Sequence, residues 1–121
     1  MNKPNSVSVI IAAGGSGERM KGINKLMSMI GGMPVIAHSM RAFEELPEVM
    51  EIIVTAREEE LAEIEKIAHD CGISKFACCV PGGETRQQSV ANGLRKVSRE
   101  TELIAVHDGA RPLVKGEYIK Q

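Results

Sequence analysis

Four short apolar runs recur along the chain, at residues 7–12, 52–54, 76–80 and 103–106. Each run is bounded by turn-forming or strongly polar residues, and each has the length of an ordinary strand. Nearly continuous apolar runs of this length are typical of strands that are buried on both faces of a sheet. We therefore expect four buried β-strands at the centre of the fold.

Between these runs, apolar residues recur three or four positions apart, which is the period of one helix face. Pro34 suits the first turn of a helix that Pro47 ends. Two further helices are predicted over residues 57–70 and 85–97, and Gly72 is well placed to cap the former. The residues expected to face inward are Ile36, Met40 and Phe43, then Leu61, Ile64, Ile67 and Ala68, and finally Val90, Leu94 and Val97.

Polar positions refine this pattern. Five glutamates (58, 59, 60, 63 and 65) fall on the outward side of the second predicted helix, which indicates a solvated face rather than a metal site. Gly31 and Gly32 predict a turn before the first helix. The residues leading to Gln121 have the character of the start of a helix.

Strand and helix alternate throughout, which predicts a parallel sheet with helices on both faces and one α/β domain over residues 1–121. Ligands of such sheets bind at the carboxyl ends of the strands, at a topological switch point. The motif-bearing turns all follow strands, at residues 13–20, 82–86 and 107–111. If the first and fourth strands are neighbours, the first turn and Asp108 face one another across a crevice.

Composition narrows the function classes. The formal net charge is −1 and the only aromatic residues are Phe43, Phe76 and Tyr118, so a nucleic-acid partner is not expected. No apolar run approaches the roughly 18 residues of a membrane span, and the first residues lack the pattern of a secretion signal. We therefore expect no membrane partner and a cytoplasmic location.

The three cysteines, Cys71, Cys78 and Cys79, lack the spacing of a zinc site or a disulfide framework. We interpret them as small buried hydrophobic residues in a reducing compartment.

The glycine-dense turn after the first strand, Ala13-Gly14-Gly15-Ser16-Gly17-Glu18-Arg19-Met20, has the features of a phosphate-binding loop. Glycines let the backbone N–H groups approach an anion, and an arginine adds a charged bidentate donor. The loop does not match the dinucleotide-binding motif G-x-G-x-x-G, because Met20 stands where the last glycine is required. The sequence contains no P-loop motif either. Arg19 and Lys25 beside the loop suit phosphoryl or nucleotidyl transfer, where negative charge builds on phosphorus oxygens. The alternative is an exposed Arg and Lys beside a structural turn.

Three motifs together carry a family resemblance. They are residues 13–20 with Lys25, then Gly82-Gly83-Glu84-Thr85-Arg86-Gln87-Gln88-Ser89-Val90, and finally Val106-His107-Asp108-Gly109-Ala110-Arg111-Pro112. In order and spacing the chain resembles the amino-terminal portion of 2-C-methyl-D-erythritol 4-phosphate cytidylyltransferase, the enzyme of non-mevalonate isoprenoid biosynthesis that joins CTP to methylerythritol phosphate. The resemblance implies a Rossmann-like three-layer α/β/α fold of the nucleotide-diphospho-sugar transferase type, with a mainly parallel sheet.

The resemblance also implies roles for the glycine loop and its cations. Arg19 and Lys25 would be catalytic, neutralising the triphosphate and stabilising the pentacoordinate α-phosphorus. Backbone groups of the loop would lie along the cytosine and the phosphates, and we assign this role to Ala13, Gly14, Gly15 and Gly17.

The later motifs would complete the nucleotide site. Gly83, Glu84 and Ser89 would contact the cytosine and ribose, and Asp108 would ligate Mg²⁺. The substrate's own phosphate would be the nucleophile, so the protein needs no covalent one. Without the resemblance, Asp108 could simply close a turn with Gly109, and Ser89 could be a packing residue.

Arg111, with Gly109, would hold the second phosphate. In the family, a second half adds a dimerising arm, a further metal carboxylate and most methylerythritol-phosphate contacts. We therefore expect these 121 residues to carry the nucleotide half of the site, with little transferase activity alone.

Three rival interpretations remain open. One is a cytidylyltransferase acting on ribitol or another polyol phosphate, and a second is a sugar-1-phosphate nucleotidyltransferase, which matches the later motifs less well. The third is a nucleotide-binding module without catalysis.

Overall fold

The computed structural model describes residues 6–13, 19–20, 23–24, 29–108 and 118–120, with backbone alone for 19–20, 23–24 and 118–120. The predictions that rest on Gly14, Gly15, Gly17 and Lys25, and those on Gly109 and Arg111, fall outside these residues.

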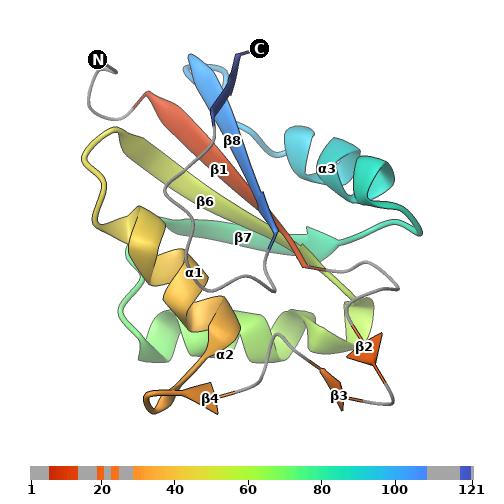
Figure 1. Ribbon diagram of the computed structural model, residues 1–121. Helices are drawn as coiled ribbons and strands as arrows, with labels where there is room; N and C mark the ends of the chain where they lie inside the picture. The colour runs from red at the N-terminus through yellow and green to blue at the C-terminus, as the bar shows by residue number, and fades with distance from the viewer. Residues whose placement is uncertain (1–5, 14–18, 21–22, 25–28, 109–117, 121) are drawn as a thin grey trace.

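A five-stranded sheet with strand order β7-β6-β1-β8-β9 forms the centre of the molecule (Figure 1). The four predicted strands are confirmed as β1 (Val7–Ala12), β6 (Val49–Ala56), β7 (Phe76–Pro81) and β8 (Leu103–Asp108). Neighbours among these four pair in parallel. β6 has eight residues and is longer than predicted, because the strand continues on both sides of the apolar residues 52–54 from which it was predicted.

The fifth strand corrects one prediction. β9 (Tyr118–Lys120) pairs antiparallel with β8, so these residues do not begin a helix. The outer edge of β8 offers a row of backbone donors and acceptors, and a short segment of chain satisfies them without needing a helix period.

Helices cover both faces of the sheet, as predicted (Figure 1). α1 (Val35–Glu44) and α2 (Leu61–Asp70) pack on one face, and α3 (Arg86–Leu94) packs on the other, against β1 and β6. The three-layer α/β/α fold with a mainly parallel sheet is therefore confirmed.

The main core lies between the sheet and the pair α1 and α2. It is aliphatic apart from Phe43, which is 1% exposed. Alternate residues of β1 supply one side of it, and the predicted inward faces of α1 and α2 supply the other. Its fully buried members from these elements include Val9, Ile11, Ile36, Met40, Phe43, Ile52, Val54 and Ile64.

The second predicted helix begins differently from the prediction. A 3₁₀ turn, η3 (Glu58–Glu60), precedes α2, and Glu60 is only 5% exposed. The expectation that all five glutamates face solvent is therefore wrong for Glu60. The 3₁₀ turn has three residues per turn, so it rotates Glu60 away from the position that an α-helical period assigns to it.

α3 turns a different face to the sheet from the predicted one. Its buried residues are Ser89 and Gly93, one helical turn apart, whereas Leu94 is 43% exposed and Val97 follows the helix. A Cβ atom on Gly93 would lie 2.9 Å from Cγ2 of Ile10 on β1 and 3.3 Å from Cγ2 of Thr55 on β6. The helix approaches the sheet so closely that only small side chains fit, and the larger Leu94 is turned outward.

We expect Gly93→Ala to lower the free energy of unfolding by about 1–2 kcal/mol, measured by chemical denaturation. Crowding of a packed core costs about 1–3 kcal/mol, and alanine recovers up to about 1 kcal/mol through its better helix propensity. Leu94→Ala is the matched control on the same helix, because exposed substitutions usually stay within about 0.5 kcal/mol. A Gly93→Ala variant as stable as the parent would contradict the close approach.

Two small hairpins precede α1. β2 (Arg19–Met20) pairs with β3 (Ile23–Asn24), and β4 (Met29–Ile30) pairs with β5 (Met33–Pro34). Gly31 and Gly32 form the predicted turn of the second hairpin, with φ of 59° and 86°. Pro34 is the N-cap of α1, one residue before the helical position predicted for it.

The cysteines are more exposed than expected, since all three are half-buried free thiols. Burial raises the pKa of Cys78, and it raises the pKa of Cys79 to about 12 with help from the charge of Glu65. Neither thiol of this pair is therefore activated as a nucleophile at neutral pH. Among the helices that the structure describes, none has the length and apolar character needed to cross a bilayer.

Candidate functional site

The carboxyl ends of β1 and β8 meet at the point where the strand order reverses. Ala12, the last residue of β1, pairs in register with Asp108, the last residue of β8. From β1 the chain runs through α1 to β6, and it reaches β8 from β7 through α3 on the opposite face (Figure 1). The first and fourth predicted strands are therefore neighbours whose connections leave to opposite faces, which is the arrangement of a topological switch point.

The start of the glycine loop is fixed by the sheet. Ala13 is 1% exposed and its N–H donates to the Thr55 carbonyl at 2.7 Å. This bond ties the first residue after β1 to β6, so the following loop starts from a defined point. Arg19 is described only as backbone, in β2.

The loop after β7 is held by a network of hydrogen bonds. The Gly82 N–H donates to the Ala56 carbonyl at 2.8 Å, and the Gly83 N–H donates to Oγ of Ser89 at 3.0 Å. The Glu84 N–H donates to Oε1 of Gln88 at 2.7 Å. The loop is therefore anchored to β6 on one side and to the first turns of α3 on the other.

Thr85 explains why α3 begins where it does. It is the N-cap residue, and its Oγ1 accepts the Gln88 N–H at 3.1 Å. Threonine at the N-cap with glutamine three residues later is the spacing of a capping box, although here the glutamine accepts from the residue before the cap. The cap orders Gln88 and thereby the loop that Gln88 holds.

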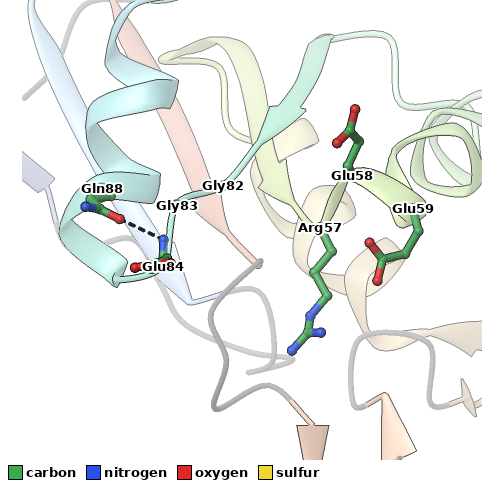
Figure 2. Close-up of a pocket in the computed structure, with 7 residues that line it drawn as sticks. All are labelled: Arg57, Glu58, Glu59, Gly82, Gly83, Glu84 and Gln88. Carbon is green, nitrogen blue, oxygen red and sulfur yellow. Dashed lines mark hydrogen bonds between the residues drawn. The ribbon is translucent and has the colours of Figure 1, made fainter.

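A pocket of about 640 Å³ opens beside this loop (Figure 2). Gly83 and Glu84, both predicted from sequence as nucleotide contacts, lie in its lining. Gly82 lines it too, and the remaining lining residues come from the end of β6, η3 and α3: Arg57, Glu58, Glu59 and Gln88.

Arg57 and Gln88 were not among the predicted site residues. Arg57 follows the carboxyl end of β6, so its place after a parallel strand could have marked it. Gln88 could have been found from its spacing to Thr85. Neither signal is specific without the fold, because surface arginines and capping boxes are common.

The charge of the lining distinguishes what this pocket can hold. The lining contains one arginine, Arg57, and three glutamates, Glu58, Glu59 and Glu84. This balance disfavours a phosphate and suits a neutral group with hydrogen-bond donors, such as an amino-bearing base or a sugar hydroxyl. A phosphate is better served by the cations predicted beside the glycine loop.

Ser89 is buried, at 1% exposure, and its hydroxyl is the acceptor for the Gly83 N–H. The interpretation of Ser89 as a packing residue is therefore incomplete, because its oxygen braces the pocket loop. Its predicted contact with the cytosine or ribose stays a prediction.

Asp108 is half-buried at the end of β8, and the preceding residue is firmly packed. His107 is 4% exposed, and its ring meets the ring of Phe43 edge to face, with centroids 5.4 Å apart. Within the described residues no group of three or more His, Cys, Asp or Glu side chains could hold a metal ion. Asp108 thus offers a carboxylate at the carboxyl end of β8, next to the end of β1.

Comparison with known proteins places these features in one family. The family model for 2-C-methyl-D-erythritol 4-phosphate cytidylyltransferase (IspD) matches residues 7–121. The cytidylyltransferase of this name from Caldanaerobacter subterraneus is 42% identical over 118 residues, which are 97% of this chain and 52% of that protein. The one from Halalkalibacterium halodurans is 41% identical over 113 residues, 93% of this chain and 49% of that protein.

Solved structures support the same family assignment. The crystal structure of 4-diphosphocytidyl-2C-methyl-D-erythritol synthase from Anaerococcus prevotii superposes with a TM-score of 0.74 at 31% identity, covering 90% of this chain and 45% of that one. The chain spans about half the length of the curated relatives it matches. It belongs to the 2-C-methyl-D-erythritol 4-phosphate cytidylyltransferase family.

Proposed function

We propose that this chain supplies the CTP-binding part of a cytidylyltransferase that transfers CMP to 2-C-methyl-D-erythritol 4-phosphate. The products are 4-diphosphocytidyl-2-C-methyl-D-erythritol and pyrophosphate. The observation that carries the proposal is that three family motifs each begin at the carboxyl end of a parallel strand of one sheet, at β1, β7 and β8. A single motif would fit many folds. Three motifs at the carboxyl ends of strands in one sheet fit a single extended ligand.

The two parts of the nucleotide have different places in this proposal. The cytosine and ribose occupy the pocket beside Gly83 and Glu84, whose lining offers hydrogen bonds and an excess of carboxylates. The triphosphate lies along the glycine loop, where Arg19 and Lys25 neutralise it. This division is supported by the charge of the pocket, which suits the uncharged part of the nucleotide.

The transfer itself needs positioning and charge neutralisation. An oxygen of the methylerythritol phosphate attacks the α-phosphorus of CTP, and a new P–O bond forms. The bond from the α-phosphorus to the oxygen that bridges to the β-phosphate breaks, and pyrophosphate leaves with that electron pair. Arg19 and Lys25 stabilise the charge that builds on the α-phosphoryl oxygens, and Arg111 with Gly109 holds the attacking phosphate.

Asp108 fits a magnesium ion by the chemistry of its donor. Mg²⁺ prefers hard oxygen ligands and is usually held by one or two carboxylates together with substrate phosphates, so the absence of a larger cluster among the described residues is no obstacle. Bound there, the ion would neutralise phosphate charge. The homodimer that the family resemblance implies for the full-length protein and the cytoplasmic location expected from the sequence pattern also belong to this proposal.

Isothermal titration calorimetry with CTP tests the nucleotide site in the chain itself. We expect saturable binding that weakens about tenfold or more in Arg19→Ala and in Lys25→Ala, because a charge-assisted hydrogen bond contributes about 1.5–3 kcal/mol. Lys66→Ala is the control, since Lys66 lies on the exposed side of α2. Binding that is absent in the parent, or equal in all variants, would contradict the proposal.

The acceptor substrate needs the whole protein. Methylerythritol phosphate and ribitol phosphate are to be compared with CTP, and released pyrophosphate measured after pyrophosphatase treatment. Faster turnover with ribitol phosphate would favour the polyol alternative.

A further inference from the structure

Two consecutive peptide groups of the pocket loop point their N–H groups at α3. The Gly83 N–H binds Oγ of Ser89, and the Glu84 N–H binds Oε1 of Gln88 (Figure 2). No cis peptide occurs among the described residues. In a trans peptide the C=O is antiparallel to the N–H, so the carbonyl oxygens of Gly82 and Gly83 point away from these side chains.

The side of this segment that faces away from Gln88 is the side on which Arg57 lies (Figure 2). Figure 2 shows Gln88 and Arg57 on opposite sides of the segment Gly82–Glu84, and all of them line the same pocket. The orientation of the Gly83–Glu84 peptide therefore decides what the pocket receives there. With the Glu84 N–H bound to Gln88, the Gly83 carbonyl is the group of this peptide left to accept a hydrogen bond in the pocket, whereas a flipped peptide would present the Glu84 N–H as a donor.

Gln88 is itself firmly placed. Its backbone N–H donates to Oγ1 of Thr85 at 3.1 Å, which sets it in the first turn of α3. Gly83 lies directly against it, since a Cβ atom on Gly83 would be 2.2 Å from Cβ of Gln88 and 2.8 Å from Oε1. The amide side chain is thus tightly packed against the peptide that it binds.

We propose that Gln88 is a positioning residue that fixes the Gly83–Glu84 peptide and so makes the pocket select an amino-bearing pyrimidine over its oxo counterpart. This inference rests on the proposed function. The exocyclic amino group of cytosine donates to a carbonyl, whereas uracil carries an oxygen at that position, which the same carbonyl repels. Gln88 lines the same pocket, and the role that we assign to it is exerted through the backbone peptide that its side chain binds.

The first test needs no ligand. Amide hydrogen exchange of Glu84 is followed by NMR in the parent, Gln88→Met, Gln88→Glu and Gln87→Met. Methionine keeps the length of glutamine without its strong acceptor, and glutamate keeps an acceptor oxygen. Gln87 is an exposed neighbour on α3 and outside the pocket lining, so Gln87→Met is the matched control. We expect exchange at Glu84 to accelerate about three- to tenfold in Gln88→Met only.

The second test measures the ratio of the dissociation constants for UTP and CTP. Both nucleotides carry the same triphosphate, so a change of charge at position 88 cancels in the ratio. We expect the ratio to fall about three- to tenfold in Gln88→Met and to stay within about twofold in Gln88→Glu and Gln87→Met.

The outcomes are distinct. Unchanged Glu84 exchange in Gln88→Met overturns the proposal, and so does faster exchange with an unchanged nucleotide ratio. If the parent chain binds neither CTP nor UTP, the proposed function is contradicted. The selectivity that we assign to Gln88 is then overturned with it. The exchange data would then still report whether Gln88 holds the peptide.

Discussion

Replacing Gly83 by alanine is expected to weaken CTP binding about thirty- to one-hundred-and-fiftyfold. The new Cβ atom would lie 2.2 Å from Cβ of Gln88, which cannot swing aside because it is the root of a helical side chain. The loop must then move off α3 and lose the bonds that the Gly83 and Glu84 N–H groups make with Ser89 and Gln88. Overpacking and two lost hydrogen bonds together cost about 2–3 kcal/mol. Calorimetric titration with CTP measures the loss.

A double-mutant cycle identifies the cause of this loss. In a Gln88→Gly background the opposing Cβ is absent, so the additional cost of Gly83→Ala should fall to about 0.5 kcal/mol or less. The same cost in both backgrounds would show that the effect of Gly83→Ala does not come from Gln88.

The second large effect concerns stability. We expect Phe43→Ala to lower the free energy of unfolding by about 3–5 kcal/mol, because a fully buried aromatic ring is removed and a cavity remains. Phe43 is 1% exposed in the main core and also packs edge to face on His107. Urea denaturation followed by circular dichroism measures the change.

Phe76→Ala is the matched control for Phe43→Ala. Phe76 lies half-buried at the start of β7, at the sheet's edge in the described strand order, so its truncation should cost clearly less. Equal losses at the two positions would contradict the assignment of the main core. Phe43→Ala also removes the edge-to-face contact with His107, the residue that directly precedes Asp108.

The sheet could be predicted from the sequence because its strands are buried on both faces. Such strands need only apolar side chains, as in Ile52, Ile53 and Val54, and the helices between them carry a clear period. The parallel arrangement then follows from alternation, and the place of the site follows from the parallel arrangement.

The sequence predictions that were wrong share one physical origin. Each depends on local geometry that the spacing of apolar residues does not encode. Leu94 was expected to be buried, but α3 approaches the sheet through Gly93 and leaves no room for it. Glu60 was expected to be solvated, but a 3₁₀ turn shifts it inward. β9 pairs with an edge that exists only once the sheet is formed.

The sequence singled out two of the residues that line the candidate pocket, but not the hydrogen bonds that hold them in place. Gly83 and Glu84 line the pocket as the motif suggested, whereas Gln88 was quoted within that motif without a role. A residue that acts by holding a peptide has no chemical signature of its own. Its importance became visible only when its amide was found 2.7 Å from the Glu84 nitrogen.

The strand order has one further consequence. The loop that we assign to the base follows β7 and the loop that we assign to the phosphates follows β1, with β6 between them. Neighbouring strands lie about 4.8 Å apart, so the two loops start roughly 10 Å from each other. Backbone hydrogen bonds between the strands set the separation between the starts of the two loops, and side chains do not. The sheet therefore fixes this distance. Substitutions in the loops can change which base or which phosphate is bound, but the distance between the two ends of the nucleotide stays constant.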